Sequence, residues 1–439
     1  MSESIREIGE RMIEEAAVIL PAGPICDDCL GRAFARCGHG LSNSERGRSL
    51  RTLLAMLGRS GKSGAAEIST AETGIAGVGT ARSDTTRTCW LCAGLFGRVA
   101  EFAGRAAVMA EGVEFDSYLF GVKLTPRLKQ MEAFFDERFS SAHNEPLKHA
   151  LNREVGKAFE AQVGRGTVAF TNPHLLFVID LNNDTIELRT LSLYFYGRYC
   201  KLIRGIPQTR WPCRACQGKG CKGCSFTGKQ YPESVEELIA APFIAASTAK
   251  AAHLHGAGRE DIDARMLGPG RPFVLELLSP KQRLLDIASL QRAVNTASAG
   301  KVEVSDLRSV SRETVAMVKE VRAEKVYRAR VSFAREISSV DLSNALSSLV
   351  GTIEQRTPVR VSHRRADLVR KRRLLTAGGT LLSPCEADLV LQGESGLYIK
   401  ELISGDEGRT VPSLTELLGV ASRVAELDVI DVVSASFPD

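Results

Sequence analysis

Apolar residues recur along this chain with two periodicities, one typical of helices and one typical of strands. Ile5, Ile8 and Met12 recur at helical spacing near the N-terminus, and Pro21 ends that predicted helix. A region of mixed pattern follows, from about residue 102 to residue 193. Within it we predict helices over residues 127–139 and 146–162, and strands over 167–172, 175–181 and from 185 onwards.

The second half of the chain predicts a larger α+β region, from about residue 231 to the end. Its expected strands lie near residues 273–278, 302–304, 326–333 and 388–392. The longest apolar stretch, residues 238–249, contains Pro242 and is too short to span a bilayer. The first residues lack the basic and apolar segments of a signal peptide, so we expect a cytoplasmic protein without a membrane partner.

Cysteine spacing indicates metal binding. Eight of the 11 cysteines form four Cys-x-x-Cys pairs, which are typical of metal ligation in a reducing compartment rather than of disulfides. Two such pairs complete a closed structural zinc site. The first expected site consists of Cys26, Cys29, Cys89 and Cys92, and a second candidate site of Cys213, Cys216, Cys221 and Cys224.

A long stretch of small residues separates the two pairs of the first site. Residues 59–88 are rich in Gly, Ala, Ser and Thr and lack apolar periodicity, so we expect a mobile insertion there. Cys37 and His39 lie close enough to the first pair to compete as ligands. Cys200 and Cys385 are unpaired in the sequence, and we expect them to be structural.

Charge is nearly balanced over the whole chain but not locally. The formal net charge of +5 does not by itself indicate a nucleic-acid partner. However, residues 195–230 hold eight basic residues and no acid, and residues 355–373 hold eight against Asp367 alone. The aromatic residues interleaved with the first run are Tyr194, Tyr196, Tyr199 and Trp211. Because basic side chains meet phosphates and aromatic rings stack on unpaired bases, the two runs predict an RNA or DNA partner.

One short segment carries candidate catalytic carboxylates. In an extended chain, Arg259, Asp261, Asp263 and Arg265 would share one face. Neighbouring guanidinium groups would then keep a carboxylate ionised even in a partly dry cleft. The pattern alone does not choose between the two aspartates.

This segment also resembles the Gly-Arg-x-Asp motif of pseudouridine synthases. From about Ile25 to Leu414, apart from residues 59–88, the chain is similar to the archaeal-type tRNA pseudouridine synthases that modify uridines 54 and 55 of the T-loop. The other segments that match this family are residues 25–32, 196–199, 204–211, 355–361, 363–367 and 405–414.

The resemblance implies an α+β protein in four parts. Residues 1–100 would form an N-terminal helix and zinc-knuckle region, and residues 101–193 a THUMP-like RNA-binding module. Residues 194–230 would form a basic connector that carries the second cysteine cluster. Residues 231–439 would form the pseudouridine synthase catalytic domain, built on a mixed, mainly antiparallel sheet.

The resemblance also implies which residues form the site. It selects Asp261 over the second aspartate as the catalytic nucleophile, and it carries over Tyr327 as the tyrosine that meets the uracil. Lys400 and Leu402 match the basic and the apolar residue expected beside the aspartate, and Arg259 would contact the phosphate backbone. The implied partner is tRNA, with structural zinc, no organic cofactor and no protein partner.

Pseudouridine formation is an isomerisation that breaks the N1–C1′ bond of uridine and rejoins the uracil through C5. An ionised carboxylate can attack the sugar or assist proton removal from it, and the residues do not choose between these routes. A non-catalytic zinc-containing tRNA-binding or RNA chaperone protein is the alternative that also explains the cysteines and basic runs. A THUMP-bearing methyltransferase or sulfur-transfer enzyme would need a cofactor-binding loop, and the sequence shows none.

Overall fold

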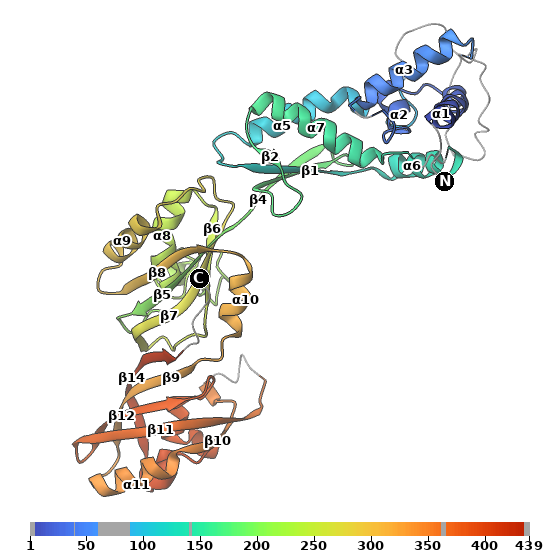
Figure 1. The fold of residues 1–439 in the computed structure, drawn as a ribbon. Coiled ribbons are helices and arrows are strands. Elements are labelled where there is room, and N and C mark those ends of the chain that lie inside the picture. Colours follow the sequence, from blue (N-terminus) through green and yellow to red (C-terminus); the bar gives the residue numbers. More distant parts are fainter. Residues whose placement is uncertain (1–4, 39, 60–87, 140–142, 361–365, 434–439) are drawn as a thin grey trace. The chain divides into compact units, whose positions relative to one another are not determined.

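The computed structural model describes residues 5–38, 40–59, 88–139, 143–360 and 366–433. The chain divides into two compact units, Met1–Leu191 and Ser192–Asp439 (Figure 1). The predicted insertion over residues 59–88 lies outside the described residues except for its two ends, and so does His39.

The N-terminal unit begins with helices that carry the first cysteine cluster. They are α1 (Ile5–Ile19), α2 (Asp27–Arg32) and α3 (Asn43–Met56), with the 3-10 turns η1 (Leu20–Ala22) and η2 (Leu95–Arg98). The predicted N-terminal helix is confirmed as α1. Helices α2 and α3 approach so closely that a Cβ atom on Gly31 would lie 1.8 Å from the carbonyl oxygen of Asn43. Only glycine fits this crossing, which packs the helix that follows Cys26 against α3.

A four-stranded sheet forms the rest of this unit, in the order β2-β1-β3-β4. Its elements are α5 (Val99–Met109), β1 (Ser117–Lys123), α6 (Pro126–Arg138), α7 (Leu147–Val163), β2 (Thr167–Val168), β3 (Leu175–Asp180) and β4 (Thr185–Thr190). Strand β1 pairs in parallel with β2 and β3, and β3 pairs antiparallel with β4. The rings of Phe120, Phe159 and Phe177 contact one another, so the apolar face of the sheet packs on α7.

The C-terminal unit is built on a ten-stranded sheet in the order β13-β10-β11-β12-β9-β14-β7-β5-β8, with β6 paired to β7. Its strands are β5 (Leu193–Lys201), β6 (Ala251–Gly256), β7 (Ala264–Leu278), β8 (Val302–Val310), β9 (Glu324–Phe333), β10 (Gly351–Arg356), β11 (Val369–Ser383), β12 (Glu386–Gly393), β13 (Thr410–Val411) and β14 (Ser422–Val433). Among the described pairs, β7 with β14 is parallel and the others are antiparallel. The predicted mixed, mainly antiparallel sheet is confirmed.

Short helices pack on this sheet. They are α8 (Val235–Ser247), α9 (Ile287–Ala297), α10 (Glu313–Glu320), α11 (Ser339–Leu349), α12 (Ile399–Ser404) and α13 (Leu414–Leu418), with the 3-10 turns η3 (Lys222–Cys224) and η5 (Asp406–Gly408). In Figure 1, α8 and α9 lie beside the strands β5 to β8, and α11 lies beside β11. The apolar stretch around Pro242 is α8; within the described ranges, no helix has the length and apolar character needed to cross a bilayer.

The start of the predicted basic connector differs from the expectation. Residues 193–201 form β5, an interior strand hydrogen-bonded to β7 on one side and to β8 on the other. Tyr194, Tyr196 and Tyr199 are buried there, so the prediction that these rings stack on RNA bases is wrong. Aromatic residues are enriched in buried strands as well as on RNA-binding surfaces, and the sequence pattern did not separate the two.

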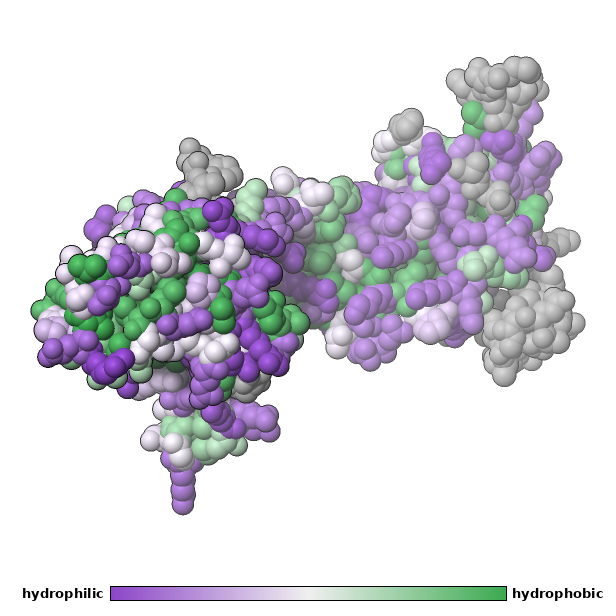
Figure 2. All heavy atoms as spheres, turned by 90° about the horizontal axis from the view of Figure 1, so that it is seen from below, coloured by the Kyte–Doolittle hydropathy of each residue, from purple (hydrophilic) through white to green (hydrophobic). Residues whose placement is uncertain are grey.

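The surface mixes polar and apolar side chains. Figure 2 shows one face of the molecule, on which hydrophilic residues (purple) are interspersed with apolar ones (green). Phe226, at the tip of the second cysteine cluster, is 72% exposed. Isolated exposed apolar residues are common on soluble proteins, so this one alone does not indicate a partner.

Candidate active site

A cavity of about 300 Å³ lies in the C-terminal unit, beside the segment that joins β6 to β7. Arg259, Asp261 and Lys400, three of the residues predicted from the sequence, line it together. Its other lining residues are Pro207, Gln208, Thr209, Trp211, Arg214, Tyr231, Glu260, Ile262, Asp263 and Arg360. Four segments that are distant in the sequence thus converge on the candidate carboxylates.

The segment with the two aspartates is not extended as expected. Residues 259–261 are irregular, a turn follows at residues 262–263, and β7 begins at Ala264. Arg265, the first arginine on the strand, points to Asp428 on β14, at 2.6 Å from that carboxylate. The guanidinium group of Arg265 therefore does not support Asp261, and the shared face predicted for this segment is wrong.

Two other cations hold Asp261. The Nη1 atom of Arg360 lies 3.0 Å from its Oδ1, and the Nζ atom of Lys400 lies 3.5 Å from its Oδ2. Lys400 is closer to Asp263, at 2.6 and 2.7 Å from its two carboxylate oxygens. Burial opposes ionisation of Asp263, but the hydrogen bond and charge of Lys400 outweigh it and hold its pKa below the usual value. Lys400 is thus shared by the two aspartates rather than reserved for one.

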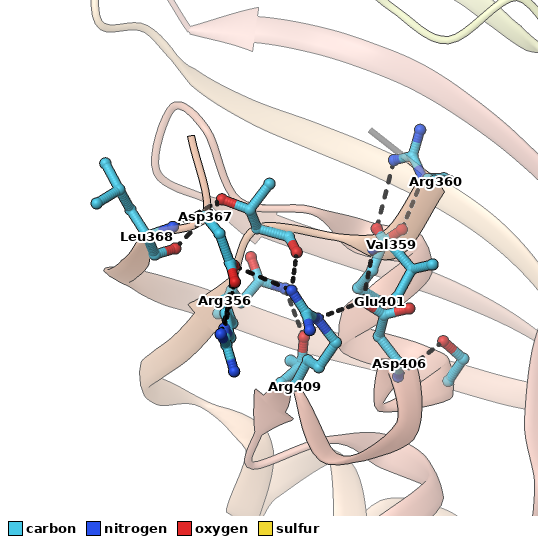
Figure 3. A network of polar contacts seen from close by, with 12 residues as sticks. Arg356, Val359, Arg360, Asp367, Leu368, Glu401, Asp406 and Arg409 are labelled. Carbon is cyan, nitrogen blue, oxygen red and sulfur yellow. Dashed lines mark hydrogen bonds and ion pairs between the residues drawn. The ribbon is translucent and has the colours of Figure 1, made fainter. Parts of the chain in front are cut away.

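Arg360 is a site residue that the sequence analysis did not assign, although it lies in the matched segment 355–361. Its Nε atom donates to Glu401 at 2.6 Å, and Glu401 is almost fully buried in α12 (Figure 3). The guanidinium group therefore bridges a buried carboxylate and Asp261. Nothing in the sequence pattern distinguished Arg360 from its seven basic neighbours, because its ion pairs join the segment after β10 to α12 and to the β6–β7 segment.

A network of polar contacts fixes the backbone just before Arg360 (Figure 3). The amide of Val359 donates to Asp406 at 3.2 Å, and Arg409 donates to the carbonyl of Thr357 and to Asp367 at 2.8 and 3.0 Å. These bonds use side chains of the matched 405–414 segment. They place Arg360 through the backbone, which explains why that segment lies next to the site without lining the cavity.

A buried charged network supports the other side of the cavity. The carboxylate of Glu260 is fully buried and accepts hydrogen bonds from Arg271 Nε and from the Tyr199 hydroxyl, each at 2.9 Å. Gln208 donates to the Tyr199 hydroxyl at 2.7 Å and to the carbonyl of Gly258 at 3.0 Å. Because each buried charge is paired, the network supports the segment that carries Asp261 rigidly.

Lys201 connects this buried network directly to the backbone of the candidate nucleophile. Its side chain is fully buried at the end of β5, and its Nζ atom donates to the carbonyl oxygens of Asp261 and Ile262 at 2.9 and 3.2 Å. Burial lowers the pKa of Lys201, while Glu260 opposes that shift. Lys201 belongs to the basic run that predicts an RNA or DNA partner. In the structure it positions the backbone of the site instead.

The structure separates the two remaining predicted residues. Tyr327 lies on β9, is 8% exposed and does not line the cavity, but burial raises its pKa to about 12 and the charge of Asp261 contributes to that shift. Tyr327 is therefore a neutral phenol near Asp261. Leu402 is fully buried in the core on α12 and does not line the cavity. Lys325, two residues before Tyr327, is a further buried group: burial and then Arg271 lower its pKa to about 8.

The second basic run, residues 355–373, is neutralised only in part within the protein. Arg356 pairs with Asp367 and Lys371 with Glu354, each at 2.6 Å. Residues 361–365, which include two further arginines of the run, lie outside the described residues. That this run contacts RNA or DNA stays a prediction.

Both cysteine groups predicted from the sequence assemble in space. In each group the four sulfur atoms lie within 4.8 Å of one another, as ligands of one metal ion would. The Sγ atoms of Cys26 and Cys92 are 3.7 Å apart, far longer than a disulfide bond of about 2.05 Å. Within the part of the chain that the structure describes, Cys37 is not a member of either group.

Comparisons with known proteins decide the family. The family described as "Pus10, C-terminal" matches residues 194–433, and "Pus10 THUMP domain, archaeal" matches residues 102–180. The chain is 46% identical to the tRNA pseudouridine synthase Pus10 of Methanothrix thermoacetophila, over 97% of this chain and 95% of that protein. The chain belongs to the Pus10 family.

Other Pus10 proteins are similar over almost the same length. The tRNA pseudouridine synthase Pus10 of Halorubrum lacusprofundi is 42% identical, over 97% of each chain. A chain in the crystal structure of a Cbf5-Nop10-Gar1 complex aligns with 44% of this chain at 17% identity and a TM-score of 0.29, too low to support an argument. The predicted relationship to archaeal-type tRNA pseudouridine synthases is confirmed by the Pus10 matches.

The two Pus10 matches fit the two units of the fold. The THUMP match runs from α5 to β3 in the N-terminal unit, and the C-terminal match begins inside β5 and ends with β14. The second match contains the whole cavity with Asp261 and Lys400.

Proposed function

We propose that this protein is a tRNA pseudouridine synthase that isomerises uridine 54, uridine 55 or both in the T-loop of tRNA. The observation that carries the proposal is the cavity in which Arg360 and Lys400 hold the carboxylate of Asp261. Pus10 relatives named as tRNA pseudouridine synthases support it. The resemblance to synthases of uridines 54 and 55 supports the choice of the T-loop, and a tRNA substrate supports a cytoplasmic location.

The residues of the cavity suit the chemistry. Two cations contact the carboxylate of Asp261 at 3.0 and 3.5 Å and orient it, and this carboxylate can attack C1′ or assist proton removal from the sugar as the N1–C1′ bond breaks. The detached uracil turns, a C5–C1′ bond forms, the C5 proton leaves and N1 gains a proton. No redox change occurs, so these steps need no organic cofactor.

Arg259 and Tyr327 have roles in binding the target nucleotide. A uridine inside a folded loop must leave its stack to reach the carboxylate, at a cost of a few kcal/mol. Arg259 is exposed at the cavity and can hold a backbone phosphate of the extruded nucleotide. Tyr327 is a neutral phenol near Asp261 but lies just outside the cavity lining, so its ring meets the uracil only when the entering nucleotide opens the cavity toward β9.

The proposal is tested by mapping pseudouridines in an unmodified tRNA transcript after incubation with the purified protein. We expect modification at position 54, 55 or both, and transcripts with cytidine at either position separate the two sites. The alternative, a non-catalytic tRNA-binding protein, would bind the transcript and leave every uridine unchanged.

We also propose that both cysteine groups hold structural zinc. Four thiolates around one zinc ion at about 2.3 Å place their sulfur atoms about 3.8 Å apart. The recorded sulfur separations are 3.7 Å for Cys26 with Cys92, 3.8 Å for Cys216 with Cys224 and 3.7 Å for Cys221 with Cys224. The backbone amides of Gly220 and Gly228 also donate to the sulfur atoms of Cys216 and Cys224, at 3.2 and 3.3 Å.

Purified protein is therefore expected to contain two zinc ions per chain, one for each cysteine group. Cys92→Ser should lose one ion and lower the melting temperature of the N-terminal unit, because structural zinc contributes directly to folding free energy. Elemental analysis and a thermal melt measure both effects. Soluble, folded protein that contains no zinc after purification without chelator would contradict this assignment.

Substitutions of Tyr327 should separate stacking from proton transfer. A phenol with a pKa of about 12 is a poor base near neutral pH, so we expect Tyr327→Phe to slow the reaction less than about tenfold. Tyr327→Leu removes the ring and should slow it far more. Single-turnover rates with saturating tRNA measure both variants. A loss of about 10²-fold or more in Tyr327→Phe would assign a proton-transfer role to the hydroxyl instead.

A further inference from the structure

We propose that the second cysteine group forms a wall of the active site, and that its Arg214 binds a phosphate adjacent to the target uridine. This inference rests on the proposed pseudouridine synthase function. It assigns an RNA contact to the segment from Trp211 to Tyr231, called here the knuckle, beyond a merely structural metal site.

The knuckle and the catalytic segment face the same cavity. Trp211, Arg214 and Tyr231 line it together with Arg259 and Asp261. The rings of Trp211 and Tyr231 meet edge to face with centroids 5.7 Å apart. Arg214 thus approaches the cavity from the knuckle, and Arg259 from the β6–β7 segment.

The position of Arg214 depends on the metal site. Arg214 lies between Cys213 and Cys216, two of the four thiolates. At the base of the knuckle, the amide of Cys213 donates to the carbonyl of Gly228 at 2.8 Å, and that of Gln230 to the carbonyl of Trp211 at 2.9 Å. The tip has little apolar core of its own, so a metal ion would hold the backbone that carries Arg214.

The charges of the cavity leave two guanidinium groups available. Arg360 and Lys400 are paired with Asp261 and its neighbouring aspartate. Arg214 and Arg259 are exposed, and neither has a hydrogen-bond or ion-pair partner among the described residues. An extruded nucleotide carries one phosphodiester on its 5′ side and one on its 3′ side. Two arginines on different segments match these two anions, because each guanidinium group can donate in parallel to phosphate oxygens.

A thermodynamic cycle of the double-mutant type, which combines a protein variant with a modified tRNA, tests the contact between Arg214 and the phosphate. The modified tRNAs carry an uncharged methylphosphonate at either phosphate that flanks the target uridine. We expect wild-type protein to bind each of them roughly tenfold more weakly than ordinary tRNA, one because the contact with Arg259 is lost and the other because the contact with Arg214 is lost. Arg214→Gln should bind ordinary tRNA roughly tenfold more weakly too, with the slope of log Kd against log salt reduced by about one. It should show no further loss with the methylphosphonate at the phosphate that Arg214 contacts, because that contact is already absent.

Lys222→Gln is the matched control. Lys222 is an exposed cation on the same knuckle, but it does not line the cavity. This variant loses the same charge and should keep the full tenfold penalty for the methylphosphonate. If the losses caused by Arg214→Gln and by the methylphosphonate multiply at both phosphates, Arg214 contacts neither of them and the inference is overturned.

The metal dependence has its own readout. Cys216→Ser should lose one metal ion per chain by elemental analysis and also lose the sensitivity to the methylphosphonate. A variant that loses that ion but keeps the sensitivity would overturn the link between metal and Arg214. Since all of these effects are measured in binding, they are independent of turnover. Failure of the wild-type protein to form pseudouridine would contradict the proposed function and leave the binding result interpretable.

Discussion

Asp261→Asn is expected to abolish pseudouridine formation, with a single-turnover rate at least about 10⁴-fold below that of the wild-type protein. The substitution keeps the size of the side chain and removes the negative charge that Arg360 and Lys400 contact. Arg360 retains its ion pair with Glu401, so the fold should be undisturbed. Rates measured at saturating tRNA, together with a thermal melt and a binding isotherm, separate a chemical defect from a structural one.

Asp263→Asn is the matched control for this prediction. Asp263 lines the same cavity and pairs more closely with Lys400 than Asp261 does, but it is 67% exposed. We expect this variant to lose less than about tenfold in rate, because Lys400 is then free to pair fully with Asp261. Near-normal turnover in Asp261→Asn, or an equal loss in both variants, would show that the choice of nucleophile is wrong.

Arg360→Gln should have the second-largest effect, a fall of about 10²–10³-fold in rate. The change removes the cation nearest to Asp261 and also leaves the buried carboxylate of Glu401 without its partner. The unpaired carboxylate should lower the free energy of unfolding by about 3–5 kcal/mol. Denaturant unfolding and single-turnover kinetics measure the two consequences separately.

The double variant Arg360→Gln with Glu401→Gln distinguishes them. It removes the stranded buried charge, so stability should recover toward the wild-type value while the rate stays low. Recovery of the rate along with stability would mean that Arg360 acts only through the fold. The same variants made in Asp261→Asn protein should have no further effect on rate, because the charge they support is absent.

The elements with strong periodicity could be predicted from the sequence. Helices α1, α6 and α7 and strands β3, β9 and β12 lie close to the predicted positions, because each has one clear apolar face. Strand β5 was missed because it carries charged and aromatic residues yet lies inside the sheet, where Lys201 and Tyr199 bond to buried groups. Strand β14 was missed because nothing in a local window shows that it pairs with both β7 and β9.

In the candidate site, too, the sequence predicted what local motifs encode and missed what depends on contacts between distant segments. Asp261, Arg259 and Lys400 were found through short motifs, and the structure brings them to one cavity. Arg360 and the supporting groups Glu260 and Lys201 were not, because their importance comes from contacts between segments 60 to 99 residues apart. Spacing alone also predicted the two cysteine groups, since a Cys-x-x-Cys pair is a local structure that needs only one partner pair.

Release of tritium from tRNA that carries [5-³H]uridine tests the central claim most directly. Rejoining the uracil through C5 expels the C5 hydrogen, so each isomerised uridine must release its label to water. We expect release by the wild-type protein without added organic cofactor, limited to one or two uridines of the T-loop, and none by Asp261→Asn. Zinc-loaded wild-type protein that binds this tRNA tightly and releases no tritium would contradict it.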